Sequence, residues 1–363
     1  MRIAVVSSPF VELQTNRYGA NERTIVERVQ ALRDAGHHVV LVAPDAGPAL
    51  PNDLRRTRRI LHPLPNSSLE KVSWVLSPKT YFQLLAYLSV DLADVDLVIN
   101  DGVPLDPLNT YLVAQRFGLK RTLNVLHGNL SLDSVWQQSS NALSRGLVYG
   151  AQNTNLCREM SSRGYFVYYS PTGAFFPPES EVTESPERRL IHLGRISPFK
   201  GTHLAIELAA RLGRKLLIVG PVGDAGYFRR SVQPMLGDSV EYRGELDRAD
   251  LVDLLRTSEG LLFTSTGNDS QGLVLLEALS FGLPIIATRP GTYSGLFDIL
   301  IEGQNGALVD LTRPDMSSAE AVLNANRREI RAAAAKLWDW RSVIANHYNP
   351  IFEQLSHSSE HAH

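Results

Sequence analysis

Short apolar runs alternate with amphipathic stretches along most of the chain. Arg2–Ser7 is rich in β-branched residues, which predicts a buried parallel strand. Apolar residues recur at helical spacing from Glu22 to about Ala35, which predicts a helix with Asn21 as its N-cap. Gly36 ends this helix, and His38–Ala43 predicts the next strand.

The same alternation continues and predicts helices near Tyr81–Ser89 and Pro107–Phe117, with strands at Asp96–Asn100 and Arg121–Leu126. Strands that alternate with helices are typical of a parallel sheet covered by helices on both faces. We therefore predict an α/β fold in which residues 1–170 form a first Rossmann-like domain.

Residues 171–188 interrupt this rhythm. They are rich in proline and acidic residues, a composition typical of an interdomain linker. The alternation then restarts, which predicts a second Rossmann-like domain over residues 189–337. Its strand candidates are Leu190–Leu193, Lys215–Val219, Val240–Arg243, Gly260–Phe263 and Pro284–Ala287.

The last part of the chain has a helical pattern. Ser317–Leu337 is alanine-rich and predicts one long helix, and Trp338–Leu355 predicts a second, amphipathic helix. We expect residues 338–355 to close the fold by packing on the first domain, and residues 356–363 to form a disordered tail. Two parallel sheets that face each other create a cleft beyond the carboxyl ends of their strands, where ligands bind.

Composition narrows the class of protein. The 363 residues carry a formal net charge of -2, which favours an ordinary globular protein over one that binds nucleic acid. The single cysteine, Cys157, excludes an internal disulfide framework and fits a cytoplasmic location. No apolar run approaches the ~20 residues of a membrane span. The first apolar run is too short for a signal peptide and is interpreted as a strand.

Two cations follow the first predicted strand of the second domain. Gly194 begins a turn, Arg195 and Lys200 lie on it, and a helix begins near Lys200. Two cations beside the free amides of a helix start suit a diphosphate, because arginine can bind two oxygens at once. A solvated turn with ordinary surface charges is the alternative.

A polar loop follows Gly260–Phe263 and leads into an apolar helix. Asp269 lies at the mouth of this helix, where it can accept hydrogen bonds from sugar hydroxyls or cap the helix. Glu277 is flanked by leucine and alanine; a carboxylate there needs partners such as ribose hydroxyls, unless it faces solvent. The residues that offer free amides at the helix start are Gly272, Leu273 and Val274.

Two further candidates lie in the first domain. His127 directly follows a strand, so it can contact a substrate hydroxyl, assist proton transfer or be a satisfied core residue. Gly19 and Ala20 precede the first helix, where small residues let a ligand approach the backbone. No Walker loop, H-E-x-x-H motif or cysteine pair indicates a metal. The glycines after Lys215–Val219 lack the spacing of a nicotinamide site, which argues against a dehydrogenase.

Together these segments resemble the retaining glycosyltransferases of family 4, which have the GT-B fold. The resemblance covers nearly the whole chain and is strongest over Gly194–Gly201 and from Asp269 to Glu277. It implies two Rossmann-like domains facing across a cleft, with a C-terminal helix that crosses back to the first. Residues 1–170 would bind the acceptor, and residues 189–337 would bind the nucleotide sugar. It also implies metal-independent transfer of a sugar from a nucleotide sugar to an acceptor hydroxyl, with the anomeric configuration retained.

The resemblance assigns roles to individual residues. Arg195 and Lys200 would bind the donor diphosphate, and Glu277 would hold the ribose. Asp269 would contact the transferred sugar, and His127 would contact it from the first domain. His127, Arg195, Lys200 and Asp269 are thus the expected catalytic residues. The other donor-binding positions that it implies are Gly19, Ala20, Gly194, Tyr242, Arg243, Gln271, Gly272, Leu273 and Val274.

The chain departs from the family pattern at three points. Asp269 stands where the family has glutamate, Ser270-Gln271 stands for its Pro-Phe, and Ala20 stands for its second glycine. These changes alter the sugar pocket and leave the cations in place. A UDP-sugar is the favoured donor and GDP-mannose the next, with no separate cofactor and a small molecule or natural product as acceptor.

Two alternatives remain open, and the sequence leaves the oligomeric state open too. The change at Asp269 also fits a nucleotide-sugar epimerase, or a binding protein without transfer. A run of arginines in the first domain fits a membrane-associated enzyme that acts on a glycolipid or polysaccharide. The members of this run are Arg55, Arg56, Arg58 and Arg59.

Overall fold

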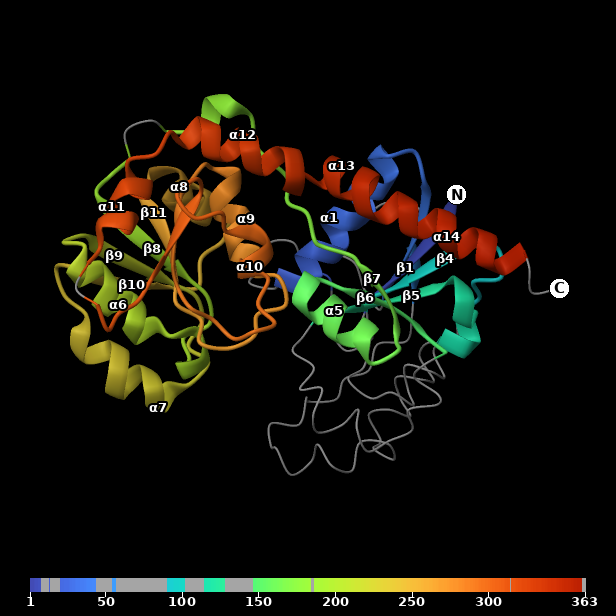
Figure 1. The fold of residues 1–363 in the computed structure, drawn as a ribbon, viewed down its shortest axis with the longest axis horizontal. Coiled ribbons are helices and arrows are strands. Elements are labelled where there is room, and N and C mark those ends of the chain that lie inside the picture. Colours follow the sequence, from blue (N-terminus) through green and yellow to red (C-terminus); the bar gives the residue numbers. More distant parts are fainter. Residues whose placement is uncertain are drawn as a thin grey trace. The chain divides into compact units, whose positions relative to one another are not determined.

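The structure is a computed structural model that describes residues 1–7, 13, 20–43, 54–56, 90–101, 114–127, 146–183, 186–313 and 315–360. The chain divides into two compact units. Unit 1 comprises Met1–Thr15, Gly19–Thr172 and Val343–His363, and unit 2 comprises Asn16–Tyr18 and Gly173–Ser342. Each unit contains one parallel sheet flanked by helices (Figure 1).

The sheet of unit 1 has seven strands in the order β3-β2-β1-β4-β5-β6-β7. The strands are β1 (Arg2–Val6), β2 (His38–Ala43), β3 (Leu54–Arg56), β4 (Leu97–Asn100), β5 (Thr122–Leu126), β6 (Val148–Ala151) and β7 (Phe166–Tyr169). The chain first builds outward from β1 to β3 and then restarts at β4 on the other side of β1. The order therefore reverses between β1 and β4, a point at which open α/β sheets bind ligands.

The helices of unit 1 agree with the sequence analysis only in part. Helix α1 (Ala20–Asp34) begins one residue before the predicted cap. Helix α5 (Thr154–Ser162) is absent from the predictions, although the side chain of Asn153 caps it by accepting from Leu156 N at 2.8 Å. The helix predicted at Tyr81–Ser89 lies outside the described residues. The one predicted to end at Phe117 is described only over 114–117, which are helical.

The C-terminal segment belongs to unit 1 from Val343 onward. Helix α13 (Trp340–Val343) continues through a π-helical turn (Ile344–Tyr348) into helix α14 (Asn349–Glu360). Helix α14 runs to Glu360, whereas the sequence analysis predicts disorder from residue 356; residues 361–363 lie outside the described ranges.

Aromatic contacts fix this segment on unit 1. The ring of Phe352 lies edge-on to His37, with 5.6 Å between centroids, and Asn349 Oδ1 is 3.1 Å from His37 Nε2. Tyr169 of β7 makes a similar edge contact with His347, at 5.2 Å. Helix α14 thus packs by buried apolar and aromatic surface, the main driving force for such docking.

The sheet of unit 2 has six strands in the order β10-β9-β8-β11-β12-β13. They are β8 (Arg189–Leu193), β9 (Lys215–Val219), β10 (Val240–Gly244), β11 (Gly260–Phe263), β12 (Ile285–Thr288) and β13 (Gly306–Val309). The helices are α6 (Thr202–Arg211), α7 (Ala225–Tyr227), α8 (Arg248–Thr257), α9 (Leu273–Ser280), α10 (Leu296–Ile299), α11 (Ser317–Leu323) and α12 (Arg327–Trp338). The strand order reverses between β8 and β11.

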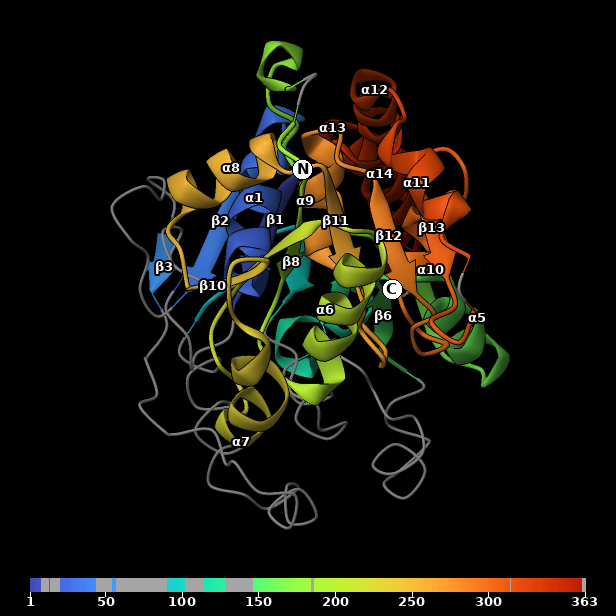
Figure 2. The same ribbon diagram turned by 90° about the vertical axis from the view of Figure 1, so that its left-hand side faces the viewer.

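Alternate residues of these strands build two cores, one on each face of the sheet. Leu190 packs with α6 and α11, whereas Ile191 and Leu193 pack with α8, α9 and α12 (Figures 1 and 2). Because successive side chains of a strand point to opposite faces, a continuous apolar run fits a sheet covered on both sides. The predicted helix Ser317–Leu337 is in fact two helices, because Asn326 caps a new one by accepting from Arg328 N at 3.0 Å.

Candidate functional site

The loops after β8 and β11 lie side by side at the carboxyl edge of the unit 2 sheet, where its strand order reverses. Thr266 N donates to Phe199 O at 2.9 Å, and Thr264 Oγ1 donates to Gly201 O at 2.9 Å. Gly201 has φ 64°, and a Cβ there would overlap the Thr264 carbonyl, so this approach requires glycine. These contacts therefore hold the two loops together as one continuous surface.

Lys200 and Asp269 form an ion pair between these loops, Nζ to Oδ1. Their side chains are 27% and 14% exposed. Lys200 Nζ also lies 5.5 Å from the centroid of the Phe199 ring, a cation–π distance. Oδ2 of Asp269 is buried and has no hydrogen-bond partner among the described residues. Asp269 therefore keeps an unused acceptor atom beside a cation.

Arg195 stands apart from this pair. It is exposed, and no described residue forms an ion pair with it. Its aliphatic stem lies across Gly223, where a Cβ would overlap it. The preceding Gly194 ends β8 and donates its N–H to Val219 O at 3.0 Å. The guanidinium thus extends from a fixed strand end and retains its hydrogen-bond donors for a ligand.

Helix α9 begins beside Asp269. Gly272 occupies its N-cap in the left-handed region, with φ 74°, and no side chain caps the helix. Gln271 is buried, and Leu273 and Val274 are half-buried. The backbone amides of this first turn are donors at the positive end of a helix, an arrangement that favours anions.

Glu277 is buried within α9 and does not face solvent. Arg248, the first residue of α8, donates from Nη1 to Glu277 Oε1 at 2.6 Å. Their side chains are 10% and 39% exposed, Glu277 being the more buried. The sequence analysis misses Arg248, and nothing in its local pattern marks it. A ribose held by Glu277 would share that carboxylate with Arg248.

Tyr242 and Arg243 of β10 have different surroundings. Tyr242 is half-buried; its hydroxyl donates to Gly220 O at 2.9 Å and its ring packs on Phe228. Arg243 is exposed and pairs with Glu241 Oε1 at 2.7 Å. Neighbouring side chains of a strand point to opposite faces, so the two residues present their side chains on different sides of β10. Their assignment as donor-binding residues stays a prediction.

His127 of unit 1 directly follows β5 and takes part in a chain of polar side chains. Its Nε2 is 2.6 Å from Asp101 Oδ1, and its Nδ1 is 3.3 Å from Gln152 Nε2. Gln152 Nε2 also donates to Thr172 Oγ1 at 2.9 Å. Both ring nitrogens therefore have protein partners, as the alternative of a satisfied histidine requires, although the sequence analysis does not identify these partners.

Asp101 directly follows β4, and its side chain is completely buried. Arg28 of α1, equally buried, donates from Nη1 to both carboxylate oxygens. Burial alone would raise the pKa of Asp101, but the Arg28 guanidinium and the hydrogen bond with His127 hold it below its ordinary value. Asp101 is therefore ionised. We call Arg28, Asp101, His127, Gln152 and Thr172 the unit 1 network.

Ala20 is the first residue of α1, and Gly19 lies outside the described residues. Within the described ranges, no three side chains of His, Cys, Asp or Glu gather where they could hold a metal ion. None of the described helices is long and apolar enough to cross a membrane.

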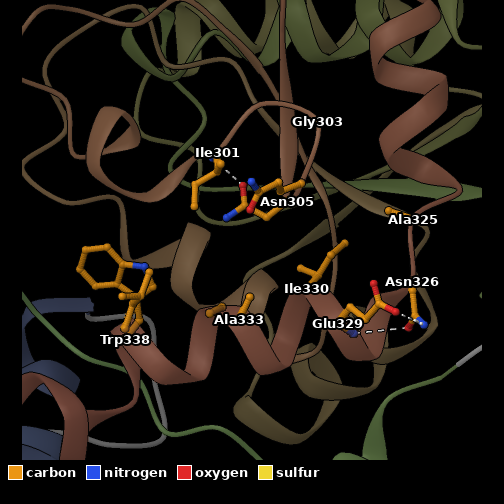
Figure 3. Close-up of a pocket in the computed structure, with 12 residues that line it drawn as sticks. Ile301, Gly303, Asn305, Ala325, Asn326, Glu329, Ile330, Ala333 and Trp338 are labelled. Carbon is orange, nitrogen blue, oxygen red and sulfur yellow. Dashed lines mark hydrogen bonds between the residues drawn. The ribbon is translucent and has the colours of Figure 1, made fainter.

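Two pockets of unit 2 lie at the opposite, amino edge of its sheet. One, of about 470 Å³, is lined by residues of the loop 301–305 before β13 and by α12, including Trp338 (Figure 3). The other, of about 870 Å³, is lined by Arg188 before β8 and Glu259 before β11. Neither contains a candidate donor-binding residue, and in α/β sheets ligands bind at the carboxyl edge.

Comparison with known proteins agrees with this geometry. Residues 177–335 match the model of the family described as Glycosyl transferases group 1. Phosphatidyl-myo-inositol mannosyltransferase of Mycobacterium tuberculosis is 28% identical over 188 residues, covering 47% of this chain and 48% of the relative. The chain thus spans about half the length of the first curated relatives it matches.

Solved structures extend the likeness to the whole fold. AviGT4, a glycosyltransferase involved in avilamycin A biosynthesis, is 19% identical and has a TM-score of 0.68 over 99% of this chain and 98% of its own. HepE of Anabaena in complex with UDP-glucose is 16% identical, with a TM-score of 0.65 over 99% of each chain. The fold is that of the GT-B glycosyltransferases, so the predicted fold class is confirmed. The match of residues 177–335 to the glycosyl transferases group 1 model supports the predicted enzyme class.

Proposed function

We propose that this chain transfers a sugar from a nucleotide sugar to an acceptor hydroxyl. The observation that carries the proposal is the cluster where the unit 2 strand order reverses: Arg195, the Lys200–Asp269 pair and the start of α9 lie on the loops of two adjacent strands. A diphosphate needs cations and amide donors, and a sugar needs an acceptor such as the carboxylate of Asp269. The glycosyltransferase group 1 domain contains all of these residues.

A metal-independent mechanism follows from these groups. Negative charge develops on the diphosphate as the bond to the anomeric carbon breaks. Arg195 and Lys200, with the amides of α9, would stabilise that charge in place of a metal ion, the kind of preorganised electrostatics that contributes most to many enzymes. The acceptor oxygen would attack on the face that the diphosphate leaves, and a phosphate oxygen would take its proton. The anomeric configuration would then be retained.

We propose a UDP-sugar as donor, because HepE, which shares the fold, is solved with UDP-glucose. The link of AviGT4 to avilamycin A biosynthesis supports a small-molecule or natural-product acceptor. The name of the M. tuberculosis relative specifies a mannosyl group and a lipid-linked inositol, so a mannose donor with a glycolipid acceptor is the second candidate. A thermal-shift series with UDP, GDP and ADP separates the donors, because a bound nucleotide raises Tm.

Arg195→Ala and Lys200→Ala test the proposal. Each should lower kcat/KM for transfer by at least about 100-fold, because each removes a group that stabilises charge in the transition state. The assay supplies UDP-sugars and GDP-sugars to a cell extract and follows nucleotide release together with sugar gained by an acceptor. Near-native circular dichroism should show that both variants fold.

The matched control is Arg313→Ala, which removes an arginine that is 79% exposed in the same unit. It should leave transfer unchanged. Unimpaired transfer in both Arg195→Ala and Lys200→Ala would remove the diphosphate assignment. Consumption of the nucleotide sugar without any gain by an acceptor would favour an epimerase, whereas binding without consumption would favour a binding protein.

A further inference from the structure

The unit 1 network holds a charged pair that the proposed transfer does not itself require. We infer that Arg28 and Asp101 are positioning residues that hold His127 as one neutral tautomer, with the proton on Nε2 and with Nδ1 as the atom that accepts a substrate hydroxyl. The part of this inference that concerns substrate rests on the proposed function, whereas the tautomer itself is a property of the protein alone.

The proton on Nε2 follows from the chemistry of its neighbour. An ionised carboxylate only accepts hydrogen bonds, so the ring nitrogen 2.6 Å from Asp101 Oδ1 must be the donor. Arg28 keeps Asp101 ionised by donating to both of its oxygens. If Asp101 were protonated, its hydroxyl could donate instead, and the proton of His127 would move to Nδ1.

The other ring nitrogen has a weaker partner. Gln152 Nε2 donates to Nδ1 over 3.3 Å, a long hydrogen bond, and it makes a shorter one of 2.9 Å to Thr172 Oγ1. The side chain of His127 is 13% exposed and that of Asp101 is completely buried. A substrate hydroxyl can therefore replace Gln152 at Nδ1 without disturbing the bond between Nε2 and Asp101.

The far end of the network is anchored by the C-terminal segment. The Tyr348 ring, at the end of the π-helical turn, lies with its centroid 5.4 Å from Arg28 Cζ. Phe352 packs on Tyr348 at 5.9 Å, and both side chains are buried. A buried arginine is costly unless it is paired, and π-helical turns are frequent at functional sites. The segment that begins at Val343 thus fixes Arg28, which fixes Asp101, which orients His127.

Nuclear magnetic resonance of protein labelled with ¹⁵N-histidine measures the tautomer directly. Spectra recorded across a pH series report the neutral ring where the chemical shifts stop changing at the alkaline end. His127→Gln identifies the signal by its loss. We expect the wild-type protein to show His127 with its proton on Nε2 alone.

Two substitutions should move that proton. In Asp101→Asn the amide can donate to the ring, so the Nδ1–H form should become populated. In Arg28→Met the buried Asp101 should take up a proton and produce the same change, whereas Arg28→Lys should restore the wild-type signal. Asp101→Asn is nearly isosteric, so it decides the matter even if Arg28→Met does not fold.

The matched control is Arg121→Lys, since Arg121 donates to three backbone carbonyls of unit 1, those of Phe117, Val95 and Leu92. It should leave the His127 signal unchanged. A wild-type His127 with its proton on Nδ1, or in a mixture, would overturn the inference. So would a signal that stays the same in Asp101→Asn, because Asp101 would then be only a structural ion-pair partner.

A kinetic measurement separates this inference from the proposed function. If the chain transfers sugar, Asp101→Asn should lower kcat about 10- to 100-fold, because a side chain that contacts the substrate loses the partner that orients it. The Kd for UDP should not change, because Asp101 and His127 are not among the proposed contacts of the nucleotide, and Arg195, Lys200 and Glu277 lie in unit 2. A wild-type protein without transfer activity would overturn the proposed function, and the spectra would still decide whether Asp101 sets the tautomer.

Discussion

The candidate sites of the two units hold their charged side chains in different ways. In unit 1, Arg28 and Asp101 are both completely buried. In unit 2, Lys200 is 27% exposed in its pair with Asp269, and Arg248 is 39% exposed in its pair with Glu277. Separating two charges that have no access to water is costly, whereas a half-exposed pair loses little when water or a ligand replaces one partner. The unit 1 network is therefore built to fix a geometry, and the candidate donor site of unit 2 to exchange partners.

Removing one charge from each unit should give the largest contrast. Arg28→Met should lower the free energy of unfolding by about 3–5 kcal/mol, because it leaves Asp101 buried without its partner. Arg248→Met should cost less, about 1–2 kcal/mol, because Arg248 is partly solvated and the Glu277 carboxylate keeps some access to water. Urea unfolding followed by tryptophan fluorescence and by far-ultraviolet circular dichroism measures both, and coincidence of the two probes tests two-state behaviour.

The double variant Arg28→Met/Asp101→Leu is the control for this experiment. It removes both charges and should recover part of the lost stability, because no unpaired carboxylate stays buried. Equal costs for Arg28→Met and Arg248→Met would mean that exposure does not distinguish the two units.

The next largest expected effect is a pH dependence of stability caused by a histidine of unit 2. His192 of β8 is buried, its Nδ1 lies 3.1 Å from Leu262 O, and its Nε2 lies 3.3 Å from Thr202 Oγ1. Burial lowers its pKa to about 4, with the nearby charge of Lys200 acting in the same direction. His127 of unit 1, in contrast, has a carboxylate partner.

The sign of the pH dependence follows from this lowered pKa. Unfolded histidine has a pKa of about 6.5, so between about pH 6.5 and pH 4 the unfolded chain binds more protons than the folded one. The free energy of unfolding should therefore fall by about 3 kcal/mol as the pH drops through this window. His192→Gln should remove this contribution, measured as the difference between two urea titration series across the window. A difference that does not change with pH would contradict the lowered pKa of His192.

The sequence predicts the strands best where a short apolar run is bounded by polar residues on both sides. Strands β9 and β11 have the predicted bounds, because each is a compact apolar run between polar loops. Strand β7 is absent from the predictions, since Phe166–Tyr169 is aromatic and only half-buried and has no alternation to mark it. The alanine-rich stretch after Ser317 hides the break between α11 and α12, which depends on the cap at Asn326.

The residues of the candidate site are likewise predictable only where a local sequence pattern marks them. Lys200 and Asp269 each follow a strand, so the rule that ligands bind at carboxyl ends predicts both, and the structure joins them. Arg28 could have been identified from the sequence, because it lies on the face of α1 that carries Ile25, Val29 and Leu32. A charged side chain on such an apolar face implies a buried partner. The identity of that partner depends on packing between residues 73 positions apart, which no local pattern encodes.

The smallest predicted effect tests whether the Lys200–Asp269 pair exchanges partners. A nucleoside diphosphate has to replace the Asp269 carboxylate on Lys200, so Asp269→Asn should raise the affinity for UDP about three- to tenfold, or ~1 kcal/mol. Transfer should fall at the same time, because the proposed sugar contact is weakened. Titration calorimetry measures the affinity for UDP. Arg195→Ala is the control, because it should weaken UDP binding instead of strengthening it. If Asp269→Asn also weakened UDP binding, the pair would act as a fixed unit like Arg28 and Asp101, and the contrast between the two units would fail at the donor site itself.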